Sequence, residues 1–334
     1  DENMMLVDID LTRRLLDYDA NEVTALQVAV AEGYSVGRAK RDISEILGEA
    51  NTWARLENAS IITAEQIQKT IYEKELRMKL YEEKLDEMMD DDVIMIDTEG
   101  AQIGQINGLA VLDMGNYAFG KPSRITATTY VGKSGIVNIE KEARLSGQTH
   151  DKGMQIITGY LGQIYAQEFP MSLSCRVCFE QNYNGIDGDS ASSTELYCII
   201  SSLAELPISQ ELAVTGSVNQ KGEIQAIGGV THKIEGFFDL CKKRGLTGKQ
   251  GVLIPVSNVK ELVLKDEVVN AVKEGVFHIY PIAHIDEGIE LLMGCEAGKK
   301  DESGMFPQNT VHGRVYEKLK MFAKVARGEL SENN

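Results

Sequence analysis

The stretch 173-LSCRVCFEQNYNGIDGDSASSTELYCIISSL-203 decides the fold class of this chain. Residues 173–179 are apolar enough to predict a buried strand, and a loop of Gly, Asp and Ser follows. Apolar residues then recur at helical spacing as far as Leu203. The same order of strand, loop and helix recurs at 213–244 and at 251–293. Strands that alternate with helices predict an α/β or α+β domain.

Length, composition and charge exclude several classes of protein. The chain has 334 residues, which allows about two domains. Its 43% hydrophobic and 25% charged residues exclude collagen, a wholly disordered chain and a small disulfide scaffold. No apolar run approaches the roughly 20 residues that span a bilayer, so we expect no membrane association. Lys and Arg number 34 against 51 Asp and Glu, and this net charge of −17 argues against a nucleic-acid partner.

The cysteines do not predict a metal site. Cys175 and Cys178 form the only close pair among five cysteines, and the five histidines do not cluster at ligand spacing. A structural zinc ion usually takes four such ligands. We therefore expect buried free thiols, no metal, and a reducing compartment, the cytoplasm.

Residues 1–92 are predicted to be helical. One helix is expected at 36–56, and Thr63-Ala-Glu-Gln66 fits the capping box that opens a second helix running to Met89. The chain begins at Asp1 without an initiator methionine or a targeting pattern. We therefore expect a processed product or part of a longer protein.

Residues 93–296 are predicted to form the α/β domain, and 297–334 a linker with an amphipathic helix at 311–326. Strands are expected at 93–96, 102–106, 109–112 and 213–218, and a hairpin is expected from 123–131 and 135–139. Gly132-Lys-Ser134 matches the last three residues of the phosphate-binding loop signature, but Ala127 occupies the position where that signature needs glycine. A turn is therefore expected there.

Ser190 lies where a loop ends and a helix begins. The run Asn184-Gly-Ile-Asp-Gly-Asp-Ser190 precedes the apolar helical pattern. Free N–H groups at a helix N-terminus stabilise an anion, as the nucleophile of an acyl transfer requires. A serine before a helix is also an ordinary N-cap. The loop alone leaves both interpretations open.

Lys233 falls on the apolar face of a predicted helix. At helical spacing that face holds Val230, Lys233, Ile234, Phe237, Phe238 and Cys241. Burial lowers the pKa of a lysine, and a neutral amine can act as a general base. Alternatively, the side chain extends from the edge of the stripe into solvent.

Together, Ser190 and Lys233 predict a serine–lysine dyad, with backbone amides around Asp189 and Ser190 holding the oxyanion. There is no G-x-S-x-G nucleophile elbow. His232 is adjacent to Lys233 on the same helix and so points in another direction. Sequence spacing alone does not show that the side chains of Ser190 and Lys233 meet in the fold. The dyad is therefore a hypothesis at this level.

At these residues the chain resembles the proteolytic domain of Lon proteases, and the Asp-Gly-Asp-Ser form is similar to the LonB-type branch. The resemblance covers about residues 93–295 and is carried by Gly188-Asp-Ser-Ala-Ser192, Val214-Thr-Gly-Ser217, Gly228-Gly-Val-Thr-His-Lys233 and Leu253-Ile-Pro255. It implies that Ser190 is the nucleophile and Lys233 the general base. It also implies that Thr215 lies near the lysine and that Asp187 is an acid of the site.

Residues 20–90 are similar to the helical lid that ends an AAA+ ATPase module, including Ile61-Ile-Thr-Ala-Glu-Gln-Ile67. In such lids an arginine senses nucleotide, and Arg38 and Arg41 are the candidates. The Walker motifs are absent from these residues. The resemblance therefore implies no cofactor for this chain, ATP and Mg for the full-length protein, a homo-hexamer, and unfolded or damaged proteins as substrates.

Two other functions stay open. The first is a non-catalytic AAA+-associated module that serves assembly or chaperone work. The second is a serine–lysine hydrolase that acts on other amides or esters.

Overall fold

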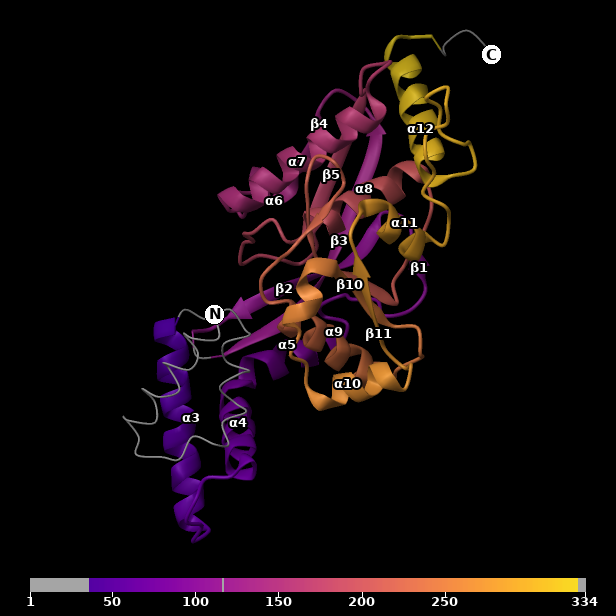
Figure 1. Ribbon diagram of the computed structural model, residues 1–334. Coiled ribbons are helices and arrows are strands. Elements are labelled where there is room, and N and C mark those ends of the chain that lie inside the picture. Colours follow the sequence, from indigo (N-terminus) through magenta and orange to yellow (C-terminus); the bar gives the residue numbers. More distant parts are fainter. Residues whose placement is uncertain (1–35, 116, 330–334) are drawn as a thin grey trace. The chain divides into compact units, whose positions relative to one another are not determined.

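The computed structural model describes residues 36–329 apart from residue 116, and the chain divides into two compact units (Figure 1). The first unit holds α3, α4 and most of α5, with short segments at 113–118 and 261–263. The second unit holds the rest of the described chain. The domain boundaries expected at residues 92 and 296 stay predictions.

The first unit is helical. It contains α3 (Val36–Leu56), α4 (Ala64–Met78) and the larger part of α5 (Leu80–Asp90). The predicted capping box is present, since Thr63 N–H donates to Gln66 Oε1 over 2.8 Å. The expectation of one continuous helix to Met89 was wrong, because the chain leaves helical geometry at residue 79. Salt bridges from Lys74 to Glu45 and from Arg77 to Glu49 join α4 to α3.

The second unit is built on a seven-stranded mixed sheet with the order β11-β10-β7-β2-β3-β5-β4. Its strands are β2 (Gln105–Asp113), β3 (Ala118–Val131), β4 (Gly135–Asn138), β5 (Leu173–Phe179), β7 (Leu212–Val214), β10 (Gly251–Pro255) and β11 (His278–Ile282). Two small sheets pair β1 (Ala101–Gln102) with β6 (Ile208–Ser209), and β8 (Ser217–Val218) with β9 (Ile224–Gln225). The predicted α/β class is confirmed.

Several strand predictions were wrong in detail. Residues 93–96 form no strand, and a turn at 103–104 splits the strand expected at 102–106. The expected hairpin of β3 and β4 is absent because β5 lies between them, antiparallel to β3 and parallel to β4. The β3–β4 connection is tied to β5 instead, since Gly132 N–H donates to the Ser172 carbonyl over 3.2 Å. Gly132-Lys-Ser134 is a turn followed by a strand, as expected.

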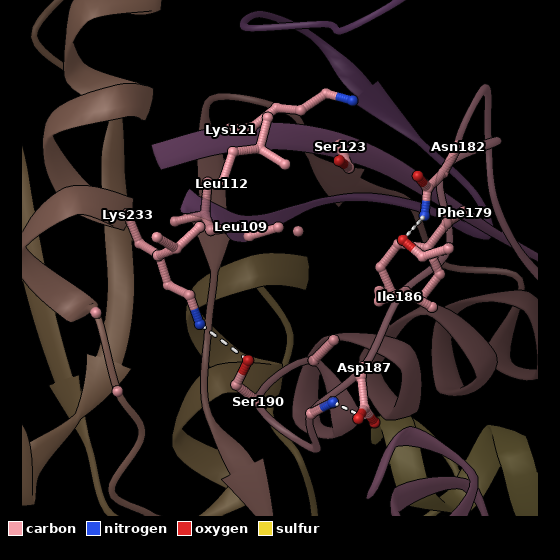
Figure 2. Close-up of a pocket in the computed structure, with 18 residues that line it drawn as sticks. Leu109, Leu112, Lys121, Ser123, Phe179, Asn182, Ile186, Asp187, Ser190 and Lys233 are labelled. Carbon is pink, nitrogen blue, oxygen red and sulfur yellow. Dashed lines mark hydrogen bonds between the residues drawn. The ribbon is translucent and has the colours of Figure 1, made fainter. Parts of the chain in front are cut away.

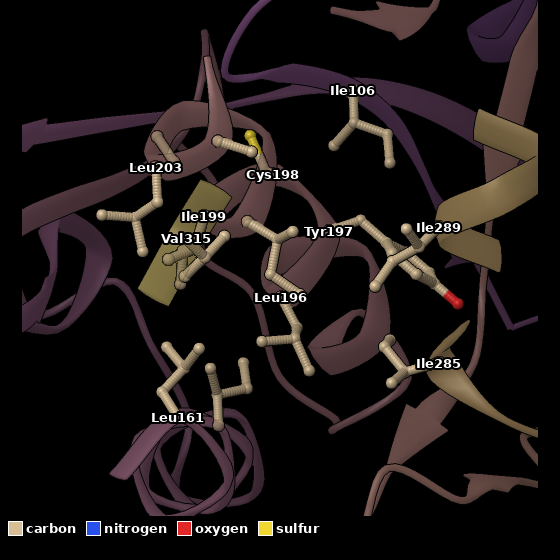
Figure 3. Close-up of a cluster of buried hydrophobic side chains, with 14 of the residues drawn as sticks. Ile106, Leu161, Leu196, Tyr197, Cys198, Ile199, Leu203, Ile285, Ile289 and Val315 are labelled. Atoms are coloured by element: carbon tan, nitrogen blue, oxygen red, sulfur yellow. The ribbon is translucent and has the colours of Figure 1, made fainter. Parts of the chain in front are cut away.

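Helices pack around this sheet with α8 (Ser192–Ala204) at the centre of the core. Every residue of α8 except Ser202 is buried. Figure 3 shows side chains of α8 among Leu161, Ile285 and Val315, which come from three other helices. The other helices of this unit are α6 (Ile139–Glu142), α7 (Gln148–Tyr165), α9 (Val230–Arg244), η2 (Val256–Glu261), α10 (Asp266–Lys273), α11 (Ile285–Met293) and α12 (Val311–Ala326).

The C-terminal helix α12 belongs to this core. It starts at Thr310, whose Oγ1 accepts from Gly313 N–H over 3.2 Å. Val311, Val315 and Leu319 are fully buried, whereas Val325 at the last turn is 40% exposed. Burying such side chains stabilises a fold by roughly 1.5–3 kcal/mol each. The helix therefore completes the hydrophobic core of the second unit.

Candidate active site

Ser190 lies two residues before α8, at the end of the Gly- and Asp-rich loop. Its carbonyl accepts from Gly216 N–H over 2.8 Å and from Thr215 Oγ1 over 3.3 Å. The strand predicted at 213–218 is broken at Thr215 and Gly216, where the chain crosses the start of α8. Ser193 fixes this crossing, since its Oγ donates to the Gly216 carbonyl over 2.7 Å.

Helix α9 reaches the site because glycines allow it to approach β3 closely. A Cβ on Gly120 would lie 1.9 Å from the His232 carbonyl oxygen, and one on Gly236 would lie 2.2 Å from the Gly120 carbonyl oxygen. Side chains at either position would therefore push the helix away. The helix starts at Gly229, whose φ of 68° is in the left-handed region that favours glycine.

The close approach brings Lys233 to Ser190. Lys233 Nζ lies 2.9 Å from Ser190 Oγ and 3.0 Å from Thr215 Oγ1 (Figure 2). Lys233 is only 3% exposed, so its side chain does not extend into solvent. The structure therefore brings three of the predicted site residues together.

Burial controls the charge of this amine. It lowers the pKa of Lys233 from its ordinary 10.5 to about 8, and the carboxylate of Asp189 opposes part of that effect. Within the described residues, no carboxylate lies within 4 Å of Nζ to hold the proton. A substantial fraction of the amine is therefore neutral near pH 8.

The two aspartates of the loop lie in different surroundings. Asp189 Oδ2 accepts from Ser217 Oγ over 3.0 Å. Asp187 instead accepts from the N–H groups of Gly188, Thr149 and His150, over 2.8, 3.1 and 3.2 Å, at the start of α7. These donors hold the pKa of Asp187 below its ordinary value. The contacts of Asp187 thus fix the loop to α7, and none of them is with Ser190 or Lys233.

A cavity of about 380 Å³ opens beside Ser190 and Lys233. Strand β2 contributes Leu109 and Leu112 to its wall, and the loop contributes Ile186 and Asp187 (Figure 2). Lys121 also lines the cavity, and burial lowers the pKa of this lysine too. The sequence did not single out Lys121, because on a strand nothing distinguishes it from a surface lysine.

Two backbone amides near the nucleophile have no carbonyl partner in the described part of the chain. These are the N–H groups of Asp189 and Ser190. They precede a helix whose N-cap position, Ala191, provides no side-chain acceptor. Such amides and the helix dipole favour a negative charge beside Ser190 Oγ.

The remaining site predictions concern metals and nucleotide. Cys175 and Cys178 are free thiols, and among the described residues no three His, Cys, Asp or Glu side chains gather as a metal site would need. Arg38 and Arg41 fall in α3, but their side chains lie outside the described residues. Their role in nucleotide sensing stays a prediction.

Comparison of the sequence with models of known protein families shows which family this chain belongs to. A sequence model of the Lon protease (S16) C-terminal proteolytic domain matches residues 79–294, and one of the archaeal LonB AAA+ ATPase LID domain matches residues 39–77. This chain belongs to the Lon protease family. The resemblance that the sequence motifs indicated is confirmed, and the proteolytic domain is preceded by a lid region. Helix α12 lies beyond the residues that the Lon model matches, yet it packs into the core of the proteolytic domain.

Relatives in the Lon family support the same assignment. The chain is 40% identical over 250 residues to a Lon protease homolog of Escherichia coli (strain K12), which covers 74% of this chain and 43% of the relative. A homolog of Haemophilus influenzae is 36% identical over 321 residues, with 92% and 53% covered. An archaeal Lon protease of Pyrococcus abyssi is 29% identical over 278 residues, with 78% and 24% covered. The chain thus spans about half the length of the first two relatives.

No helix in the described residues is long and apolar enough to cross a membrane.

Proposed function

We propose that this chain is the peptide-cleaving part of a Lon-type serine endopeptidase, with Ser190 as nucleophile and Lys233 as general base. The single observation that carries the proposal is the 2.9 Å contact between Ser190 Oγ and the buried amine of Lys233. A buried lysine without a carboxylate partner is costly to a fold, which favours a catalytic role.

The hydrogen bonds around the amine direct its lone pair. Thr215 Oγ1 lies within 3.3 Å of the Ser190 carbonyl and can donate its hydrogen there, so its oxygen is free to accept a hydrogen from Lys233 Nζ. In the neutral amine the lone pair then faces Ser190 Oγ. Thr215 would therefore orient the base toward the proton that it accepts.

The proposed reaction passes through an acyl-enzyme. Ser190 Oγ bonds to the scissile carbonyl carbon as its proton passes to Lys233 Nζ, and the amides of Asp189 and Ser190 stabilise the oxyanion. The C–N bond then breaks, and Lys233 gives its proton to the leaving amine. A water molecule next attacks the ester and gives a proton to Lys233 Nζ, which again acts as base. The bond from the acyl carbon to Ser190 Oγ then breaks, and Lys233 returns the proton to Ser190 Oγ as the acid leaves. The contacts of Asp187 with α7 support this loop from outside the dyad.

The longer protein is proposed to work as the resemblance implies. Its substrates would be unfolded or damaged proteins, its assembly a homo-hexamer, and its location the cytoplasm. ATP and Mg would act in the full-length protein, with Arg38 or Arg41 sensing nucleotide, and this chain itself would bind no cofactor. Neither a membrane nor a nucleic acid is an expected partner of a chain with a net charge of −17.

The test compares cleavage of unfolded casein and a fluorogenic peptide by this chain and its variants. Ser190→Ala and Lys233→Ala should each lower the rate by a factor on the order of 10⁴ to 10⁶. Matched controls are Lys242→Ala, on the exposed side of α9, and Ser257→Ala, at an exposed serine of η2. Both controls should keep the parent rate.

Each other function has its own outcome in this test. Cleavage that survives both dyad changes would exclude the dyad. Hydrolysis of small esters without cleavage of casein would favour a different serine–lysine hydrolase. A chain that cuts nothing and whose Ser190 does not react with an acylating probe would favour the non-catalytic module.

A further inference from the structure

Lys121 lies half-buried on the wall of the cavity that Ser190 and Lys233 share. It comes from β3, and Ser123 lines the same cavity two residues further along the strand. Because alternate residues of a strand point to the same face, the amine and the hydroxyl face the cavity together. Figure 2 shows the Lys121 amine and Ser123 across the cavity from Ser190.

Three charged side chains line this cavity, and two of them already have partners. Lys233 contacts Ser190, and Asp187 accepts from three backbone N–H groups. Lys121, in contrast, has no ion pair or hydrogen bond with any described residue. Burial lowers the pKa of Lys121, and no carboxylate of the described chain opposes that effect. Lys121 is therefore a cation of the cavity wall without an anion of this part of the chain to pair with.

The polar groups on the same wall as Lys121 can also donate hydrogen bonds. Ser123 Oγ has no hydrogen-bond partner among the described residues. Asn182, which lines the cavity as well, donates from Nδ2 to the Gly185 carbonyl over 3.4 Å, and its amide carries a second hydrogen. An ammonium group, a hydroxyl and an amide together favour an anion such as a carboxylate over an apolar or basic side chain.

The size and the remaining wall of the cavity suit a side chain of a bound peptide. A volume of about 380 Å³ is far larger than the roughly 10–15 Å³ that one water molecule needs. Leu109, Leu112 and Ile186 make part of the wall apolar. A glutamate side chain combines two methylene groups with a carboxylate, so it matches both the apolar and the polar parts of this wall.

We infer that Lys121 and Ser123 form a subsite that binds the carboxylate of an acidic substrate residue near the scissile bond, so that the chain prefers to cut close to Asp or Glu. The ammonium group of Lys121 pairs with this carboxylate, and Ser123 Oγ donates a hydrogen bond to it. The pair stabilises the charge that burial disfavours in the free chain. The inference rests on the proposed function of Ser190 and Lys233, because the subsite selects substrates only if a peptide is cut there.

The first test identifies, by mass spectrometry, the bonds that are cut in a mixture of peptides of defined sequence with amidated C-termini. We expect Asp or Glu to be enriched at one position near the bonds that the parent chain cuts. The enrichment should disappear in Lys121→Met and persist in Lys121→Arg, which keeps a positive charge. Lys133→Met, at an exposed lysine of the turn after β3, is the matched control and should keep the enrichment. A parent without it, or Lys121→Met with the same enrichment, would overturn the inference.

The second test compares two fluorogenic peptides that differ only in having Glu or Gln at that position. The parent should cut the Glu peptide with a kcat/KM about 10- to 100-fold higher, as expected for a hydrogen bond to a charged group. In Lys121→Met this ratio should fall to about one. Because one enzyme cuts both peptides, the ratio does not change when a variant folds poorly. A ratio in Lys121→Met equal to that of the parent would contradict the subsite.

Exchanging the charges sharpens this comparison. Lys121→Glu should cut a peptide with Lys at the same position faster than the Glu peptide, because like charges in the subsite repel and opposite charges attract. A Lys121→Glu chain that still prefers the Glu peptide would show that the preference arises elsewhere.

The third test is independent of catalysis and measures peptide binding to Ser190→Ala by fluorescence anisotropy. The amidated Glu peptide should bind about 10- to 100-fold more tightly than the Gln peptide, and adding Lys121→Met should remove the difference. A preference that appears only with a free C-terminus would overturn the assignment to an acidic side chain. If the parent cuts no peptide, the proposed function fails and the binding measurement still decides the subsite. If the parent cuts the Glu and Gln peptides equally well, only this inference fails.

Discussion

The two sides of α9 carry the same residue type in opposite surroundings. Lys233 is 3% exposed, and the groups that contact its amine are two hydroxyl oxygens. The side chains of Lys242 and Lys243 are 54% and 48% exposed, and they pair with Glu267 and Asp90. Because the helix and the residue type are shared, the difference comes from position on the helix. A buried amine near hydroxyls can act as a base, whereas an exposed amine beside a carboxylate stays charged.

The largest expected effect separates these lysines by activity. Lys233→Met keeps the shape of the side chain and removes the base, so peptide cleavage should fall by a factor on the order of 10⁴ or more. Lys242→Met should keep the parent rate, because that amine lies on the exposed side of α9, where it pairs with Glu267 and not with Ser190. The measurement is kcat/KM with a fluorogenic peptide. Equal losses of activity in the two variants would show that the buried position of Lys233 gives it no special role in cleavage.

Lys233→Met should lower the activity but raise the free energy of unfolding. The pKa of Lys233 is about 8 in the fold and ordinarily 10.5, so the unfolded chain binds this proton more tightly. Below pH 8 the fold is therefore destabilised by about 3 kcal/mol, and that cost fades as the pH rises from 8 to 10.5. At pH 7, urea unfolding should show Lys233→Met to be more stable than the parent by up to this amount. A less stable variant would mean that the amine supports the fold.

The pH dependence of cleavage should reflect the buried amine. Since the reaction needs neutral Lys233, whose pKa is about 8, the rate should rise with pH and level off above that value. At pH 6 it should be at least about a hundredfold lower than at the plateau. Measurements of kcat/KM from pH 6 to 10 test this expectation. A rate that is flat between pH 6 and 8 would show that the base is not this lysine.

The smallest expected effect concerns the hydroxyl that orients the amine. Thr215→Val keeps the branched shape and removes Oγ1, which lies 3.0 Å from Lys233 Nζ. We expect kcat to fall roughly tenfold, as for loss of one directing hydrogen bond. Thr158→Val, at a half-buried threonine of α7 whose Oγ1 donates to the Met154 carbonyl of the same helix, is the control. A larger loss in the control would show that the effect is structural.

Local features of the fold could be predicted from the sequence. Helical spacing and end signals indicated the bounds of α3 and α12, and the apolar stripe of α9 correctly put Lys233 on its buried side. Strand pairing could not be predicted this way. Alternation of apolar and polar residues indicates that a segment is a strand, but it does not indicate which strand pairs with it. The absent β3–β4 hairpin is the result.

The contact of Ser190 with Lys233 could be expected from the motifs, but the spacing of the two residues could not establish it. The contact depends on Gly120 and Gly236, which let α9 approach β3, and on Gly216, which binds the Ser190 carbonyl. The position of Lys121 on the cavity wall was missed for the same reason. Most of the other residues of that wall come from separate segments, and no local pattern links them to Lys121.

The most direct test of the account is covalent labelling of the chain with a fluorophosphonate, followed by peptide mapping. We predict that Ser190 is modified in the parent and in Lys242→Met, and that Lys233→Met reacts far more slowly. Labelling of Ser190 at the same rate in Lys233→Met would contradict the central claim that the buried amine activates this serine.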